Sequence, residues 1–157
     1  MRTRSSGVSG KVAVVTGAAG VLGRAISAAL LAAGLRVALV DLNSDRVEQA
    51  RADLGSAERT LAVPLDVSDV EAVEKAMQAL AAKWGAPSVL INNAGILSNN
   101  KSAATSAAEF ENVLRVNTTG AFLMAKCVWQ EKGVTGLSFS RAHSEGFDIR
   151  VEFDRTP

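Results

Sequence analysis

The chain has 157 residues, with 17 basic against 16 acidic side chains, so its formal net charge at pH 7 is +1. Such a balance excludes the strongly basic surfaces that bind nucleic acid or anionic membranes, and no apolar run reaches the ~18 residues of a membrane helix. The single cysteine excludes an internal disulfide, the single histidine excludes a multi-histidine metal site, and the absence of tyrosine excludes chemistry by a phenol.

Short apolar runs alternate with segments of helical character from residue 11 onward. The preceding residues 1–10 are polar and lack a hydrophobic core, so we expect a flexible N-terminus rather than a targeting segment. Nearly unbroken Val/Leu-rich runs are typical of parallel strands with helices on both faces, and they occur at residues 11–15, 36–40, 60–67 and 88–92. The alternation predicts one domain with an α/β sheet and right-handed crossovers. The single cysteine and the lack of a membrane-helix run favour a cytoplasmic location.

Three helices are predicted between these strands. The first two, at about residues 22–33 and 44–54, are each followed by a glycine, which is common just after a helix end. The third is expected to begin with a capping box formed by Ser68 and Glu71. Its apolar residues recur every three or four positions and are interpreted as core: Val70, Val73, Met77, Leu80 and Trp84.

A fourth helix is predicted to begin with a second capping box, Ser106 with Glu109, and to continue to Glu131. Its inward stripe is expected to comprise Phe110, Leu114, Asn117, Ala121, Met124 and Val128. Residues 132–157 lack helical periodicity and are expected to form an irregular tail. A weak alternation in this tail is compatible with a loose hairpin and involves Leu137, Phe139, Ile149, Val151 and Phe153.

A glycine-rich turn, TGAAGVLG at residues 16–23, lies between the first predicted strand and the first predicted helix. Glycines in this position allow a pyrophosphate to approach the backbone, and the free N–H groups and dipole of the following helix stabilise its negative charge. The same residues are also compatible with an ordinary tight connection between a strand and a helix.

The second predicted strand ends at Asp41, which lies 18 residues beyond Gly23. An acid about 20 residues after such a turn hydrogen-bonds the ribose diol of a dinucleotide. Because its charge repels a 2′-phosphate and neither neighbour, Val40 or Leu42, is basic, the sequence favours NAD over NADP. Alternatively, Asp41 caps the second helix, a role that Asn43 or Ser44 could also fill.

These residues resemble the short-chain dehydrogenase/reductase family. TGAAGVLG is similar to its TGxxxGxG pattern, LDVSD (65–69) to the segment after its third strand, INNAGI (91–96) to its NNAG motif, and RVNTTGAF (115–122) to its fourth-helix motif. The resemblance covers residues 11–128 and implies a Rossmann-type, doubly wound parallel sheet, truncated after the fourth strand and fourth helix. Residues 11–131 would then form an incomplete dinucleotide-binding domain.

The resemblance also implies roles for individual residues. Asp66 and Val67 match the pair that contacts adenine, and Asn117 matches the asparagine of the catalytic Asn-Ser-Tyr-Lys tetrad. The residues expected to bind NAD are Gly17, Gly20, Leu22, Gly23, Asp41, Leu42, Asp66, Val67, Asn93, Ala94 and Gly95.

The sequence departs from the family pattern in two ways. Val21 stands where the family has its middle glycine, and a β-branched residue does not easily adopt positive φ, so either the turn is shifted or the cofactor binds more weakly. The catalytic serine is not matched, and a chain without tyrosine contains no Tyr-x-x-x-Lys motif. Loss of a positioned acid/base typically lowers the rate about 10²–10⁴-fold.

Other residues are weak substitutes for the missing groups. His143 is expected to be a solvated bystander, and Lys126 and Lys132 are expected to be surface charges. Ser138 or Ser140 would take the place of the catalytic serine only if GLSFS (136–140) is a fifth strand of the sheet. For Asn117 the alternative role is that of a buried asparagine satisfying a helix kink.

Three interpretations follow. The chain is an oxidoreductase by lineage, acting on alcohol or carbonyl substrates and expected to be catalytically deficient; or a non-catalytic dinucleotide-binding module; or a truncated or frame-disrupted product. A module could form homo- or hetero-oligomers through a second stripe on the fourth helix, comprising Val113, Val116, Leu123 and Cys127. The open edge of the fourth strand predicts marginal stability and self-association.

Overall fold

The computed structural model describes residues 9–98, 102–131, 136–141 and 149–154. The strands are β1 (Val12–Thr16), β2 (Arg36–Asp41), β3 (Thr60–Pro64), β4 (Val89–Ile91), β5 (Gly136–Arg141) and β6 (Ile149–Asp154). The helices are α1 (Val21–Ala32), α2 (Ser44–Asp53), α3 (Val70–Trp84), α4 (Ala107–Leu114) and α5 (Ala121–Glu131), with a 3-10 turn η1 (Ser102–Ala104) and a π-helical segment η2 (Arg115–Gly120). None of the described helices is both long and apolar enough to cross a membrane.

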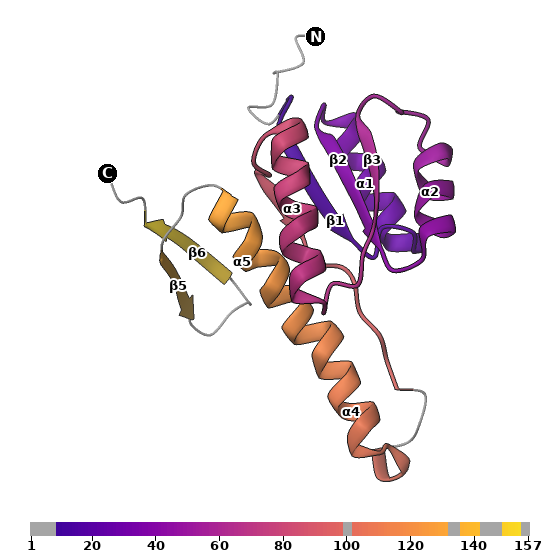
Figure 1. The fold of residues 1–157 in the computed structure, drawn as a ribbon, viewed down its shortest axis with the longest axis vertical. Helices are drawn as coiled ribbons and strands as arrows, with labels where there is room; N and C mark the ends of the chain where they lie inside the picture. The colour runs from indigo at the N-terminus through magenta and orange to yellow at the C-terminus, as the bar shows by residue number, and fades with distance from the viewer. Residues whose placement is uncertain (1–8, 99–101, 132–135, 142–148, 155–157) are drawn as a thin grey trace.

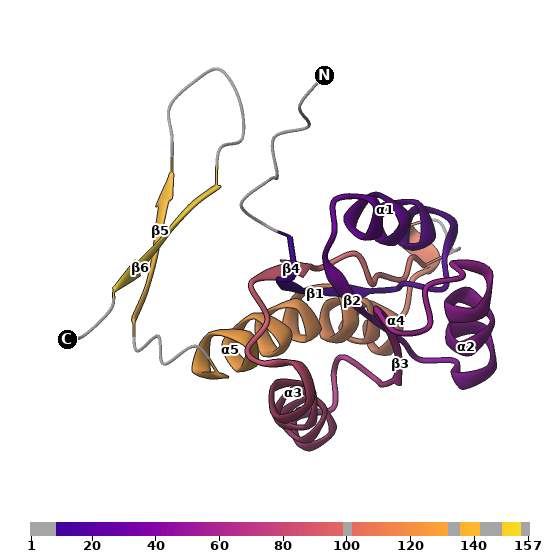
Figure 2. The ribbon, with the colours of Figure 1, turned by 90° about the horizontal axis from the view of Figure 1, so that it is seen from above.

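Four strands form a parallel sheet in the order β3-β2-β1-β4, as the alternating apolar runs predict (Figure 1). Helices α1 and α2 lie on one face and α3 and α5 on the other (Figure 2), so the sheet is doubly wound. Every residue of β1 is buried, which explains why this strand has no alternation of polar and apolar residues.

Successive residues of the central strands pack on opposite faces of the sheet. Val14 and Val40 join the core under α3 and α5, whereas Val15 and Leu39 join the core under α1 and α2. This period of two gives each face its own apolar layer. The prediction for α3 is largely confirmed, since its residues Val73, Met77 and Leu80 are buried, but Val70 at its start is exposed.

The residues that cap the N-termini of the helices are partly those predicted from the sequence. The side-chain oxygen of Asn43 caps α2 by accepting from the Arg46 amide at 2.9 Å, and Ser106 and Glu109 form the expected capping box. The capping box predicted for α3 is wrong: Asp69 caps this helix by accepting from the Ala72 amide at 3.1 Å. Ser68 does not cap the helix because its hydroxyl donates a hydrogen bond to Asp66 instead.

The predicted fourth helix is interrupted by the π-helical segment η2. Beyond it, Met124 and Val128 are buried as predicted, but no residue of α4 is buried, and Phe110 and Leu114 are 58% and 44% exposed. In Figure 1, α4 extends away from the sheet. A π turn contains more residues than an α turn, so a stripe with a period of 3.6 loses its phase across η2.

The second predicted stripe, proposed as a subunit contact, is also wrong. Leu123 and Cys127 are buried in the core that α5 shares with α3 and the sheet, and Val116 packs against that core. The pKa of the Cys127 thiol is raised, chiefly because the thiol is buried. The negative charges of Glu74 and Glu131 raise this pKa further. These side chains therefore stabilise the subunit itself.

The strand β4 lies at the edge of the parallel sheet, where among the described strands it pairs only with β1. The hairpin suggested for the tail is present: β5 and β6 form a separate antiparallel pair. The condition under which Ser138 or Ser140 would replace a catalytic serine is thus not met, because β5 does not extend the parallel sheet. His143 and Lys132 lie outside the described residues, as does most of the predicted N-terminal segment.

Candidate functional site

The turn between β1 and α1 is built around glycines that the backbone itself requires. Gly17 has a φ of 63°, which favours glycine. A Cβ on Gly23 would lie 2.2 Å from the Gly17 carbonyl oxygen, whereas a Cβ on Gly20 would meet only that same oxygen, at 3.4 Å. The two glycines therefore differ: Gly23 allows the helix to pack on the turn, and Gly20 leaves open space beside the helix N-terminus.

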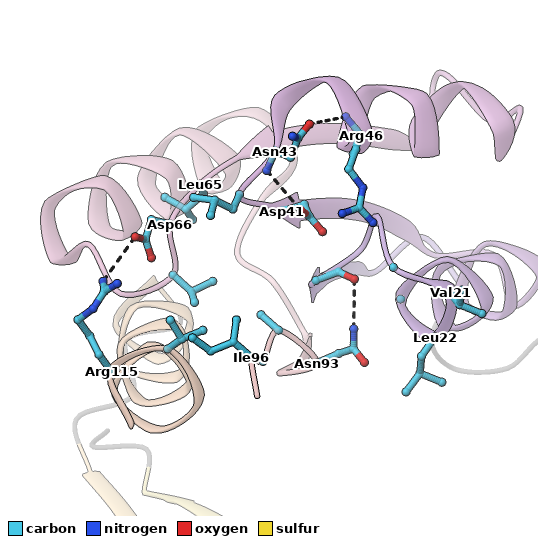
Figure 3. Close-up of a pocket in the computed structure, with 18 of the residues that line it drawn as sticks. Val21, Leu22, Asp41, Asn43, Arg46, Leu65, Asp66, Asn93, Ile96 and Arg115 are labelled. Carbon is cyan, nitrogen blue, oxygen red and sulfur yellow. Dashed lines mark hydrogen bonds and ion pairs between the residues drawn. The ribbon is translucent and has the colours of Figure 1, made fainter. Parts of the chain in front are cut away.

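The side chain at position 21 does not strain this turn. Val21 is the first residue of α1, so its backbone is helical and needs no positive φ. Its side chain is 91% exposed and lies at the rim of the cavity described below (Figure 3). The backbone of the turn thus accommodates valine at position 21, and any effect of this residue on a ligand would come from the bulk of its side chain at the rim of the cavity.

A buried hydroxyl joins the glycine-rich turn to the end of β4. Thr16 Oγ1 accepts from the amides of Asn93 at 3.0 Å and Ala94 at 2.9 Å. The Asn93 side chain donates to the carbonyl oxygens of Thr16 at 3.0 Å and Gly17 at 3.2 Å. These bonds fix the NNAG segment against the turn, so that both lie at the carboxyl end of the sheet.

The acid at the end of β2 is held by two backbone amides. Asp41 Oδ2 accepts from the Ala19 amide at 3.0 Å, and Oδ1 accepts from the Asn43 amide at 3.3 Å. Asn43, not Asp41, caps α2. The carboxylate of Asp41 is therefore oriented beside the glycine-rich turn while its remaining lone pairs stay available for a ligand.

A second acid lies in the loop after β3. The pKa of Asp66 lies below its usual value, chiefly because its carboxylate accepts a hydrogen bond from the Ser68 hydroxyl. The Ser68 amide and the positive charge of Arg115 lower the pKa further, and they outweigh the opposite effect of partial burial. The Arg115 guanidinium lies 3.5 Å from Asp66 Oδ2 and also donates to Ser68 and Asn112. The carboxylate is thus ionised at neutral pH and linked to η2.

Asn117 connects η2 to the segment after β4. Its side chain accepts from the Ile96 amide at 2.8 Å and donates to the Ile96 carbonyl at 2.9 Å. It is exposed, so the alternative of a buried asparagine is wrong, although it does lie in the irregular helical segment. Asn117 does not line the cavity described below.

A cavity of about 610 Å³ opens at the carboxyl ends of the parallel strands, as Figure 3 shows in close-up. Its volume falls within the ~300–1,000 Å³ that is usual for small-molecule sites. The structure brings together here every residue predicted to bind the cofactor: Gly17, Gly20, Leu22, Gly23, Asp41, Leu42, Asp66, Val67, Asn93, Ala94 and Gly95. The glycine cradle, a helix N-terminus and an oriented carboxylate fit a dinucleotide.

Sequence reasoning missed two basic residues of the cavity wall, Arg46 and Arg115. The position of Arg46 could have been inferred from the sequence, because it lies in the first turn of α2. Helical side chains lean toward the helix N-terminus, which here points toward Asp41. Arg115 had no comparable signal, since its position depends on the contact between η2 and the loop after β3.

Comparisons with known proteins agree with this geometry. Residues 11–136 match the family model described as short chain dehydrogenase. The chain is 39% identical over 127 residues to a short chain dehydrogenase/reductase of Macrophomina phaseolina, covering 79% of this chain and 73% of that protein. It is 39% identical over 122 residues to the D-threitol dehydrogenase of Mycolicibacterium smegmatis, covering 76% and 46%.

A solved structure extends the likeness to three dimensions. The 3-ketoacyl-(acyl-carrier-protein) reductase of Brucella melitensis, complexed with NADH, superimposes with a TM-score of 0.73 at 30% identity, covering 79% of this chain and 50% of that one. Apart from the Macrophomina protein, the chain spans about half the length of these relatives.

Proposed function

The chain belongs to the short-chain dehydrogenase/reductase family of Rossmann-fold oxidoreductases, and we propose that its residues 11–131 form a dinucleotide-binding unit that takes NAD into the cavity of Figure 3. The observation that carries this proposal is the Asp41 carboxylate, which two backbone amides orient beside the glycine-rich turn. A carboxylate there accepts hydrogen bonds from a ribose diol and repels a 2′-phosphate, which supports a preference for NAD.

The remaining walls suggest where the other parts of the cofactor bind. The diphosphate would lie on the open side of Gly20 at the N-terminus of α1, where amides and the helix dipole stabilise anions. Leu42, Asp66 and Val67 would hold the adenine, and Asn93, Ala94 and Gly95 would border the nicotinamide half. When bound, the nicotinamide supplies hydride transfer to or from a carbon of an alcohol or carbonyl substrate.

The chain's own residues provide only part of the chemistry that such a reaction needs. Asn117 holds the main chain of Ile96 through two hydrogen bonds, so we propose that it positions the segment beside the nicotinamide. The sequence contains no tyrosine, and a positioned acid/base contributes about 10²–10⁴-fold to the rate. We therefore propose that residues 11–131 bind the cofactor in the cytoplasm and do not themselves supply a tyrosine for the proton transfer.

Titration with NADH, followed by fluorescence, tests this function. Wild-type protein is expected to bind NADH saturably, and Asp41→Ala to bind it about ten- to a hundredfold more weakly, since hydrogen bonds to charged groups contribute about 1.5–3 kcal/mol. Asp45→Ala is the matched control, because it removes a carboxylate from α2 that does not line the cavity. Absence of saturable binding in the wild type would refute the proposal, and an unchanged affinity in Asp41→Ala would leave that residue a structural role alone.

One observation favours a second function, that of an association module. Helix α4 has no buried residue and exposes Phe110 and Leu114, and β4 lies at the sheet edge. Exposed apolar helices and unpaired strand edges promote association with another copy or with a related subunit. The proposed contact is this face of α4 rather than the stripe predicted from the sequence.

The oligomeric state provides the corresponding test. Light scattering after size-exclusion chromatography is expected to show self-association of the wild type, and Phe110→Ser with Leu114→Ser to shift the protein toward monomer. Glu111→Ser, which alters an exposed polar residue of the same helix, should leave the distribution unchanged. A monomeric wild type with a single cooperative thermal transition would count against this function.

A further inference from the structure

Arg115 lies on the cavity wall beside Asp66, at the start of η2 (Figure 3). Its guanidinium Nη1 lies 3.5 Å from Asp66 Oδ2 and also donates to the Ser68 hydroxyl. Its Nη2 donates to Asn112 Oδ1 at 2.9 Å, which ties the same side chain to α4. One planar group therefore joins the loop after β3 to a helix that lies 47 residues further along the chain.

These contacts treat the two carboxylate oxygens of Asp66 differently. Oδ1 accepts from the Ser68 amide at 2.9 Å and from the Ser68 hydroxyl at 2.5 Å. A serine hydroxyl has one hydrogen and two lone pairs, so the Ser68 oxygen that accepts from Arg115 still donates its hydrogen to Asp66. Oδ1 is thus occupied by two donors, whereas Oδ2 faces Arg115 and retains a lone pair for a ligand.

An oriented carboxylate can distinguish two purine bases that differ in a single group. An ionised carboxylate only accepts hydrogen bonds. The exocyclic amino group of adenine is a donor, whereas hypoxanthine has a keto oxygen, an acceptor, at the same position. The side chain of Asp66 is 37% exposed, so its hydrogen bonds and ion pair, rather than close packing, hold it in one orientation.

We propose that Arg115 is a positioning residue for recognition of the base: by holding Asp66 and Ser68 in place, it enables the site to select adenine over hypoxanthine. This inference rests on the proposed binding of a dinucleotide, and it assigns the selectivity to the pair of Arg115 and Asp66 rather than to Asp66 alone. Because Arg115 belongs to η2, recognition of the base then depends on the contact between η2 and the loop after β3.

Two reduced cofactors that differ only in the base test this assignment: NADH carries adenine, and reduced nicotinamide hypoxanthine dinucleotide carries the keto oxygen. Fluorescence titration of the wild type is expected to show a preference for NADH of about tenfold or more, since the other cofactor loses a hydrogen bond to a charged group. In Arg115→Gln this preference should fall about two- to fivefold, the range expected for a partly exposed ion pair. Arg51→Gln, which breaks an ion pair of α2 outside the cavity, is the matched control and should leave the preference unchanged.

A second background shows whether Arg115 acts through Asp66. The side chain of Asp66→Asn offers both a donor and an acceptor, so this variant is expected to bind the two cofactors with similar affinities. Adding Arg115→Gln to Asp66→Asn should not change the ratio of the affinities further, because no carboxylate remains to be positioned. Thermal melting of each variant checks that the fold is retained.

The ratio of the two affinities separates positioning of Asp66 from a role in stability. An equal loss of affinity for both cofactors in Arg115→Gln, or an unchanged ratio, overturns the assignment, and so does a further fall of the ratio in the double variant. If the wild type binds both cofactors equally well, the assignment fails while the proposed binding of NAD stands. If the wild type binds neither cofactor, the proposed function fails and the assignment fails with it.

Discussion

Replacing Gly23 with alanine is expected to lower the free energy of unfolding by about 3 kcal/mol, the upper end of the cost of overpacking a closely packed site. The added Cβ would lie 2.2 Å from the Gly17 carbonyl oxygen and 2.7 Å from the Ala18 Cα, both backbone atoms. Alanine favours a helix over glycine by about 1 kcal/mol, which is too little to offset this overlap. Urea denaturation monitored by circular dichroism measures the change.

Gly20→Ala is the matched control in the same turn. Its Cβ would meet only the Gly17 oxygen at 3.4 Å, and the backbone φ of −75° suits any residue. The free energy of unfolding should therefore change by less than about 1 kcal/mol, as it does for substitutions without a steric conflict. Equal stabilities of the two variants would show that α1 can move away from the turn at little cost, contrary to the close packing described above.

Replacing Thr16 with valine is expected to cost about 2–4 kcal/mol. The substitution keeps the shape of the side chain but removes the acceptor of the Asn93 and Ala94 amides, and an amide left without its partner typically costs about 1–3 kcal/mol. These two residues are partly buried, so water compensates incompletely. Chemical denaturation gives the change in stability, and amide hydrogen exchange at Asn93 and Ala94 should become faster.

Thr16→Ser distinguishes the hydroxyl from the packing of the side chain. Serine keeps the acceptor and loses one methyl group, which costs about 1 kcal/mol. Its exchange rates at the two amides should resemble those of the wild type. Similar destabilisation by serine and valine would assign the effect to the lost methyl group or to a rearranged backbone, and not to the hydrogen bonds.

Much of the fold and site could be predicted because the signals are local. The apolar runs of β1 and β2 reflect burial on both faces, and the glycine-rich turn and Asp41 follow directly from the ends of those strands. All the residues expected to bind NAD lie on one cavity because the carboxyl ends of parallel strands meet at one edge.

The errors arose where several interactions compete. Asp69 caps α3 because Asp66 engages the Ser68 hydroxyl, a choice that helix propensity does not determine. The stripes of the fourth helix failed because periodicity was extended across η2, whose wide turn changes which side faces the sheet. Arg115 reaches the site through tertiary contacts that no spacing along the sequence encodes.

The burial of Cys127 between α5 and the rest of the core has a practical consequence. Because the chain has one cysteine, any reaction of the protein with a thiol reagent is a reaction of this residue. Cys127 is only 4% exposed, at the base of a small pocket that Glu74 and Glu131 also line, so we expect slow labelling while α5 is packed, and burial, which raises the pKa of the thiol, slows it further. The rate at which the unmodified protein is labelled therefore reports how readily this helix opens, and no engineered probe is needed.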